Sequence, residues 1–193
     1  MNGLCLLPYG PVEENILAAL EEGLWRAFGF RVSRLDPRPP PAFAIDARRG
    51  QCNSHLLLGD AATRHPSNRS RLLGVTEADL FIPMLSFVFG QAQVGGKSAV
   101  VSVARLKQEF YGLDPNPPLT CRRALKEGIH EIGHTLGLTH CSDRNCPMSL
   151  SNTIRQVDVK GDELCESCAI SMKETLSKLS GKHDENSLAH SGR

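Results

Sequence analysis

The eleven residues HEIGHTLGLTH, from His130 to His140, constrain this chain more than any other stretch. His130 and His134 are four residues apart, so on an α-helix both imidazoles leave the same face one turn apart. Glu131 lies about 100° round the helix from His130, where its carboxylate can reach a water molecule on a shared metal ion. Gly137 can adopt the left-handed conformation that ends a helix, which would bring His140 back toward the other histidines. The segment therefore predicts three nitrogen ligands around one zinc ion with a fourth position open, as in catalytic zinc sites.

A helix with solvated or hydrogen-bonded histidines is the alternative explanation of the same residues. Two histidines and a glutamate alone would leave it open, since short helical matches recur by accident. The third histidine and the glycine at the turn favour the metal. The prediction is that His130, His134 and His140 bind a catalytic zinc and that Glu131 is the general base.

Four of the seven cysteines follow this segment in two pairs. Cys141 and Cys146 are separated by four residues, and Cys165 and Cys168 by two. Four thiolates around one zinc form a closed structural site. Two disulfides, or a redox-active pair at Cys165 and Cys168, are the alternatives. Disulfides need an oxidising compartment, and a redox pair leaves the first two cysteines unexplained. The prediction is a second, structural zinc, which makes two Zn²⁺ in all.

The segments HEIGHTLGLTH, CSDRNCPM and, after a sixteen-residue gap, CESC together resemble the archaemetzincin family, a branch of the metzincin zinc peptidases. The resemblance covers residues 130–168, and FVFGQAQVGGKSAVVS (87–102) is also similar to the family. It implies a metzincin-type fold and a zinc metallopeptidase that hydrolyses peptide bonds in a peptide or protein substrate. It also implies that a methionine, here Met148, forms the floor of the metal pocket.

We expect an α/β fold of α+β character, with a mixed twisted sheet, packing helices and an active-site helix. Residues 1–181 are expected to form one catalytic domain. Its N-terminal lobe, 1–137, includes the active-site helix. Its C-terminal lobe, 138–181, holds the four-cysteine zinc and the last helix. Residues 182–193 are polar and without pattern, and are predicted to be a disordered tail.

The N-terminal part begins with a predicted strand, helix and strand. Residues 3–8 form an apolar run, and 30–35 alternate like a strand. Between them apolar residues recur every four from Val12 to Leu24, and Gly29 ends the helix. This order predicts a parallel strand pair with a crossover helix.

Further elements follow with weaker patterns. A helix is predicted around residues 46–63, with Leu56, Leu57 and Ala61 facing inward, and a strand within 72–83. Thr120 is predicted to cap the active-site helix and Asp162 the last helix. Gly95 and Gly96 predict a hairpin.

Residues 87–94, the first strand of this predicted hairpin, are expected to form the edge strand beside the active-site cleft, where an extended peptide could pair with the backbone. A plain edge hairpin without that role is the alternative.

Composition and charge narrow the partners. The chain has 193 residues, a formal net charge of +1 and a pI near 7.6, with no basic run interleaved with aromatics, so no nucleic-acid partner is expected. Its first residues, MNGLCLLPYGPVEEN, match neither a signal peptide nor a membrane span. With several free thiols expected, the sequence predicts a cytoplasmic protein, taken as a monomer.

A zinc-stabilised peptide-binding protein with little or no turnover is the alternative function. The glutamate between the first two histidines argues against it, because a purely structural three-histidine site has no need of a base there. A thiol redox protein is a third possibility, and it predicts loss of activity when Cys165 and Cys168 are alkylated in the zinc-free protein.

Overall fold

The computed structural model describes residues 3–67 and 70–188, with side chains described as far as residue 178. The main sheet contains β1 (Gly3–Tyr9), β2 (Arg31–Arg34), β5 (Ser70–Thr76), β8 (Gly90–Ala92) and β9 (Ser98–Ser102). A smaller sheet contains β3 (Ile45–Asp46), β4 (Gln51–Asn53), β6 (Leu80–Ile82) and β7 (Leu85–Val88). The helices are α1 (Glu14–Phe28), α2 (Ser54–Ala62), α3 (Pro117–Thr135), α4 (Ile154–Val159) and α5 (Glu166–Leu188). Three short 3-10 turns are η1 (Ala42–Ala44), η2 (Ala104–Leu106) and η3 (Glu109–Tyr111).

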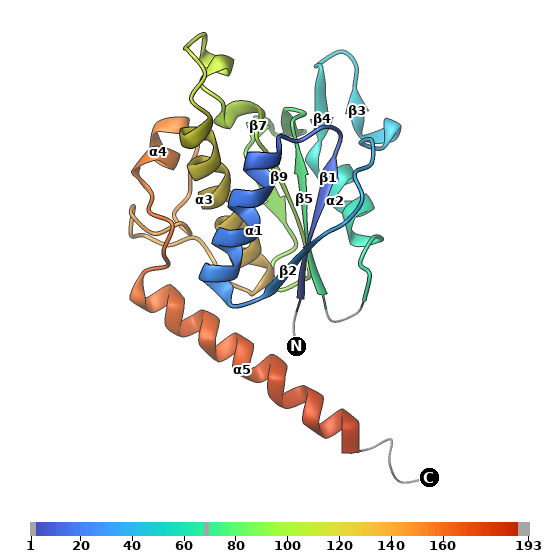
Figure 1. Cartoon of the computed structure of the whole chain (residues 1–193), viewed down its shortest axis with the longest axis vertical. Coiled ribbons are helices and arrows are strands. Elements are labelled where there is room, and N and C mark those ends of the chain that lie inside the picture. The colour runs from blue at the N-terminus through green and yellow to red at the C-terminus, as the bar shows by residue number, and fades with distance from the viewer. Residues whose placement is uncertain (1–2, 68–69, 189–193) are drawn as a thin grey trace.

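The main sheet has the strand order β2-β1-β5-β9-β8 and is parallel except for β8, which runs antiparallel to β9 at one edge. Helices α1 and α3 pack against one face, and α2 covers the other (Figure 1). The predicted parallel pair with a crossover helix is confirmed, and Gly29, with φ 67°, ends α1 as expected. The predicted α/β fold with a mixed sheet is likewise confirmed.

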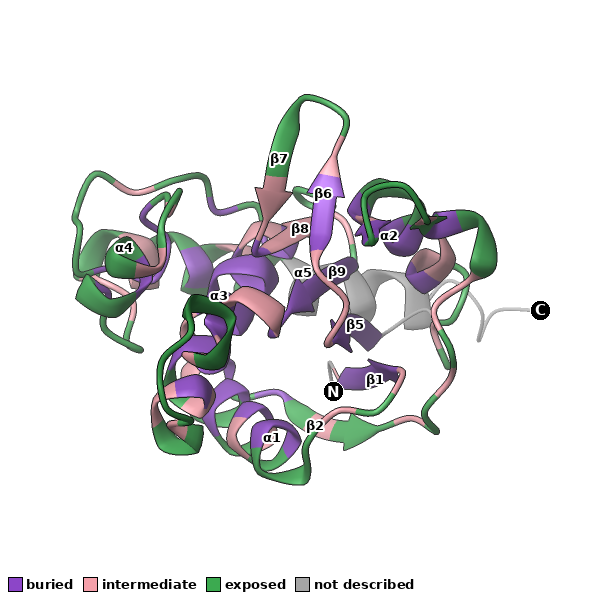
Figure 2. Cartoon of the chain, turned by 90° about the horizontal axis from the view of Figure 1, so that it is seen from above, coloured by how far each residue is buried: buried purple, intermediate pink, exposed green. Residues whose placement is uncertain are grey.

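Alternating side chains of the central strands supply two hydrophobic cores. Leu6 and Leu73 point to the α1 and α3 side, whereas Leu7 and Leu72 point to the α2 side. This period of two is the direct consequence of strand geometry. Figure 2 shows the result, with buried residues gathered in α3 and the central strands and exposed residues in the first half of β7.

The helix predicted around residues 46–63 begins later than expected. The first residues of that range lie in the antiparallel pair β3–β4, and α2 starts only at Ser54. The Asn53 side chain accepts hydrogen bonds from the backbone N–H groups of His55 and Leu56, which makes it the N-cap. Leu56 is 39% exposed, so its predicted inward orientation is wrong, and Leu58 is buried instead.

The strand predicted within 72–83 is two strands in different sheets. β5 lies in the middle of the main sheet, and β6 pairs with β4 and β7. Between them the Thr76 hydroxyl accepts a hydrogen bond from the N–H of Ala78, which turns the chain. The hairpin at Gly95 and Gly96 is confirmed between β8 and β9.

The last helix also differs from its prediction. α5 begins at Glu166, four residues after Asp162, and runs to Leu188, away from the body of the molecule (Figure 1). The predicted tail thus begins within α5, and its last residues, 189–193, lie outside the described residues. No helix within 3–67 and 70–188 is both long and apolar enough to cross a membrane.

Candidate active site

Helix α3 starts one turn before the predicted cap. The Asn116 side chain accepts a hydrogen bond from Leu119 N–H at 3.1 Å, and Pro117 and Pro118 occupy the first helical positions. Proline suits these positions because it lacks an N–H that would otherwise be unpaired. The predicted cap, Thr120, therefore lies inside the helix.

The end of α3 is a tight turn at Gly137, which has φ 85°. Leu138 N–H donates to the Gly133 carbonyl at 3.1 Å, and Gly137 N–H donates to the His134 carbonyl at 2.9 Å. This pair of bonds is a Schellman motif, which needs a left-handed residue that glycine adopts without strain. The turn brings His140 back beside the helix, as the sequence predicted.

Backbone contacts join this helix end to the β8–β9 hairpin. Gly95 N–H donates to the His134 carbonyl at 2.9 Å. The buried guanidinium of Arg71 donates to the carbonyls of Thr135 at 2.9 Å and Gly96 at 2.6 Å. Burial lowers the pKa of Arg71 to about 10, so it stays charged at neutral pH, where a cation at a helix C-terminus is favourable. These hydrogen bonds therefore fix the position of the β8–β9 hairpin relative to the end of α3 that carries His134.

The first two histidines face each other in a way that calls for a cation. His130 Nδ1 lies 2.8 Å from the Pro147 carbonyl, and His134 Nδ1 lies 2.8 Å from the Leu138 carbonyl. A carbonyl only accepts, so in the neutral rings each Nδ1 carries the proton and each Nε2 a lone pair. The two Nε2 atoms are 3.0 Å apart. Two lone pairs at that distance repel unless a positive ion lies between them.

The third histidine completes the group. The ring of His140 lies 5.3 Å from that of His130 and 5.0 Å from that of His134, and the ligand atoms of the three are all within 4.8 Å of one another. Zinc–nitrogen bonds of about 2.0–2.1 Å place ligand atoms of a tetrahedral site about 3.3 Å apart. The chemistry and spacing of this donor set therefore fit one zinc ion.

Burial keeps the imidazoles of His130 and His134 in the neutral form that binds metal. It lowers the pKa of His130 well below its ordinary value and lowers that of His134 as well. Both rings are therefore neutral at pH 7. Burial, and then the negative charge of Glu127, raise the pKa of Glu131 well above its ordinary value.

The three histidines open into a cleft of about 630 Å³ between α3 and the edge strand. Residues 85–92 line one wall, and Leu150, Ser151 and Asn152 line another. Glu131 also lines this cleft and is only 4% exposed. Met148 is fully buried and packs where a side chain at Gly133 would collide with its sulfur. A buried glutamate and three imidazoles thus line one cleft.

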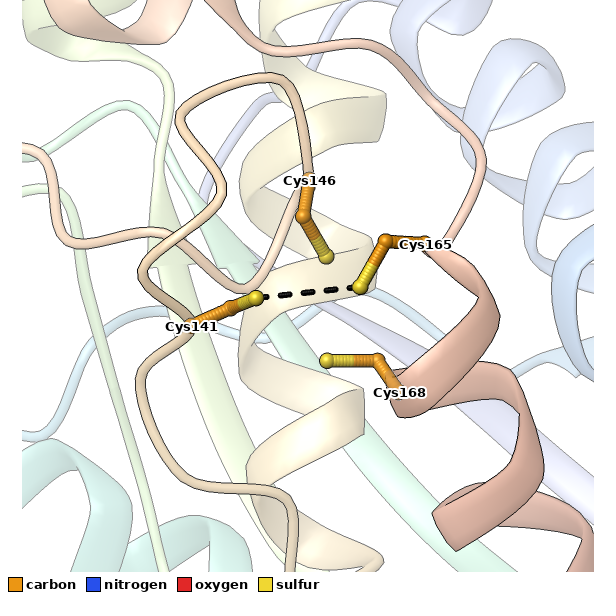
Figure 3. Close-up of side chains that lie close together, drawn as sticks. All are labelled: Cys141, Cys146, Cys165 and Cys168. Carbon is orange, nitrogen blue, oxygen red and sulfur yellow. Dashed lines mark hydrogen bonds between the residues drawn. The ribbon is translucent and has the colours of Figure 1, made fainter.

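The four predicted cysteines form a second cluster, whose sulfurs point to one centre from a loop and from the start of α5 (Figure 3). All are free thiols, and Cys141 Sγ lies 3.7 Å from Cys165 Sγ. Disulfide sulfurs would be about 2.05 Å apart, whereas zinc–sulfur bonds of about 2.3 Å place tetrahedral ligands about 3.8 Å apart. The cluster therefore fits zinc and not disulfides. Cys141 groups with the other cysteines and not with the histidines, although it follows His140 directly.

Hydrogen bonding and burial give two of these thiols different pKa values. The Ser167 hydroxyl, 3.3 Å away, lowers the pKa of Cys165 to about 6. Burial raises the pKa of Cys168. Cys165 therefore loses its proton more readily than Cys168, and a bound cation would be needed to release the Cys168 proton at neutral pH.

Three consecutive residues connect the two clusters. Cys146 belongs to the cysteine group, the Pro147 carbonyl orients His130, and Met148 packs under α3. The Met148 carbonyl also accepts a hydrogen bond from Cys141 N–H at 3.0 Å. A displacement of the cysteine cluster would therefore be transmitted to the first histidine.

Two residues near the cleft are absent from the sequence predictions. Glu127 stands one helical turn before Glu131, and its carboxylate accepts a hydrogen bond from the buried ammonium of Lys160 at 2.9 Å. The spacing of four could have revealed Glu127, since it places both carboxylates on one helix face. Lys160 is 33 residues away in the chain, and no local pattern announces it.

Comparisons with known proteins agree with this geometry. A family model described as Peptidase family M54 matches residues 67–174. The archaemetzincin of Methanocaldococcus jannaschii is 44% identical over 165 residues, which cover 86% of this chain and 89% of that protein. The archaemetzincin crystal structure from Methanopyrus kandleri is 38% identical, with a TM-score of 0.80 over 91% of this chain and 96% of that one.

The structure of a zinc-dependent peptidase from Methanocorpusculum labreanum is also similar, at 28% identity and a TM-score of 0.81. The match covers 88% of this chain and 100% of that one. These relatives cover 86–91% of this chain, and the residues matched by the family model, 67–174, include both clusters. This chain therefore belongs to the archaemetzincins, peptidase family M54, and is a zinc metallopeptidase.

Proposed function

We propose that the protein hydrolyses peptide bonds with Glu131 as general base beside a zinc ion held by His130, His134 and His140. The observation that carries the proposal is the pair of Nε2 lone pairs 3.0 Å apart, in a cleft that Glu131 also lines. Zinc, when bound, would supply Lewis-acid chemistry, lowering the pKa of a water molecule and polarising the scissile carbonyl.

The protein groups supply proton transfer and orientation. A Glu131 carboxylate oxygen takes the proton of the attacking water and passes it to the leaving amine. The Pro147 and Leu138 carbonyls orient the rings of His130 and His134, so that each presents Nε2 to the metal. Met148 forms the floor of the pocket.

The substrate is proposed to lie along β8 as an added strand. Ser102 N–H donates to the Phe89 carbonyl, and Gln93 N–H donates to the Ser98 carbonyl. In an antiparallel ladder the intervening residues, Gly90 and Ala92, then turn their N–H and C=O groups away from β9. No other strand of the described ranges pairs with this edge, so an extended peptide could pair with it.

Cys141, Cys146, Cys165 and Cys168 are proposed to hold a second, structural zinc. The spacing of their sulfur atoms and the absence of disulfides support this assignment. The site would tie the chain that leaves His140 to the start of α5. Because all seven cysteines are free thiols, we also propose a reducing compartment, the cytoplasm.

The test compares Glu131→Ala with the parent protein on a peptide library, each loaded with zinc. Glu131→Ala should keep its zinc and lose about 10²–10⁴-fold in turnover, the usual contribution of a general base. Glu22→Ala, an exposed glutamate on α1, is the matched control and should cleave like the parent.

Cleavage by Glu131→Ala at the rate of the parent would refute the assigned role. A parent protein that binds peptides and hydroxamates but cleaves nothing would instead support the peptide-binding alternative.

A further inference from the structure

Gly90 occupies an unusual place in the edge strand. A Cβ atom built on Gly90 would lie 2.5 Å from Glu131 Oε1 and 2.7 Å from both Cδ and Cγ of the same side chain. Real Cβ contacts do not occur below about 3.0 Å, because repulsion rises steeply inside van der Waals contact. The side chain of Glu131 therefore fills the space that any side chain at position 90 would need.

Backbone conformation gives no reason for a glycine here. Six glycines have positive φ in the described ranges, and Gly90 is not among them. An alanine could adopt its extended conformation without strain. Glycine is therefore needed at position 90 because the Glu131 carboxylate occupies the space of a side chain.

Nothing else described in the structure fixes that carboxylate by hydrogen bonding. Within residues 3–67 and 70–178, whose side chains are described, the side chain of Glu131 has no hydrogen bond, and it is 4% exposed. Its neighbour Glu127 is engaged by Lys160 instead. Close packing against the bare backbone of Gly90 is thus a contact that limits where the Glu131 oxygens can lie.

We propose that Gly90 is a positioning residue for the general base. Its missing side chain lets the Glu131 carboxylate lie against the strand edge, while its own outward N–H and C=O face the bound peptide. The scissile bond and the base are thereby brought to the same point of the cleft. This inference rests on the proposed function of Glu131.

The variant Gly90→Ala tests it. The added methyl must push the carboxylate away, so kcat should fall by about 100-fold, the order of loss for a misplacement of about 1 Å. KM and zinc content should stay near the parent values, and the pH profile of kcat/KM should shift with the displaced base. The control is Gly59→Ala on α2, where an added Cβ meets nothing within 4 Å. A Gly90→Ala enzyme with kcat within about twofold of the parent would overturn the proposal.

A double-mutant cycle separates positioning from other roles. In Glu131→Ala the colliding side chain is gone, so adding Gly90→Ala should change neither the melting temperature nor the affinity for an uncleaved peptide. The melting temperature should fall only when Gly90→Ala is made in the parent. This measurement therefore still tests the proposal if Gly90→Ala alone folds poorly. If the double variant binds the peptide several-fold more weakly than Glu131→Ala alone, Gly90 acts through strand pairing and the positioning proposal is wrong.

These readouts also separate the two proposals. The melting cycle needs no turnover, so the contact between Gly90 and Glu131 can be verified even if the parent cleaves no peptide. In that case the proposed function fails while the steric coupling stands. A catalytically active parent with no coupling between the two positions would instead refute the positioning role alone.

Discussion

Asp60 shows how single residues set the response of this fold to acid. Its carboxylate accepts a hydrogen bond from the Tyr9 hydroxyl at 2.6 Å and another from the Arg64 guanidinium at 2.8 Å. The bond from Arg64, followed by that from Tyr9, lowers the pKa of Asp60. Because the folded pKa lies below the unfolded value of about 3.9, the stabilisation is fully present above that value and is lost as the pH falls through the folded pKa.

Replacing Asp60 by Asn should therefore lower stability near pH 7 and change it little in strong acid. The measurement is the free energy of unfolding against pH for parent and Asp60→Asn at equal zinc content. The difference between the two curves isolates Asp60 from the loss of zinc in acid, which both proteins share. A difference that is independent of pH down to about pH 2 would contradict this reading of the pair.

At the scale of elements, α3 and α4 are joined by charged side chains. Arg123 donates two hydrogen bonds to the Asp158 carboxylate, at 2.7 and 2.8 Å. One turn further along α3, Glu127 pairs with Lys160, and these two side chains are only 4% and 0% exposed. A buried pair adds little compared with apolar residues, but removing one partner leaves an uncompensated charge. The pair therefore makes the packing of α4 on α3 sensitive to either residue.

Lys160→Met should destabilise the fold by about 3–5 kcal/mol, because the Glu127 carboxylate would stay buried without its partner. The double variant Glu127→Leu/Lys160→Met is the matched control and should recover most of the loss. Urea unfolding of the zinc-loaded proteins measures both values. If the double variant is no more stable than the single one, the loss has another cause, such as poor packing of the new side chain at position 160.

At the scale of the whole molecule, three consecutive residues link the two clusters. Cys146, Pro147 and Met148 contact the cysteine cluster, His130 and α3 in turn. A change in one cluster should therefore be felt in the other. The loop between Cys146 and Cys165 also contains α4, so the cysteine cluster closes the part of the chain that covers α3.

Cys165→Ser should lower the zinc content from the expected two ions to one, lower the melting temperature and weaken the remaining zinc. The physical reason is that the Pro147 carbonyl would no longer be held where it orients His130. Elemental analysis, melting curves and chelator titration measure the three effects. Cys121→Ser, a half-buried thiol outside the cluster, is the control and should keep both ions. Two retained ions and unchanged melting in Cys165→Ser would contradict the coupling.

The sequence predicted the elements that depend on residues close together in the chain better than those that depend on distant partners. The Gly29 helix end, the crossover pair and the Gly95 hairpin follow from local patterns, and all are present. The helix expected around 46–63 is present but starts only at Ser54, because residues before the Asn53 cap form the β3–β4 strand pair instead. Local propensity could not decide between helix and strand there without the partner strands.

The sequence by itself identified the two groups of side chains that could bind metal, because the histidines and the two cysteine pairs lie within short segments whose geometry a helix or a turn dictates. Only the tertiary structure decided what surrounds that chemistry. The ammonium of Lys160 beside Glu127, the guanidinium of Arg71 at the end of α3 and the bare backbone of Gly90 against Glu131 all join distant parts of the chain. Such contacts depend on how helices pack on the sheet, which no single segment specifies.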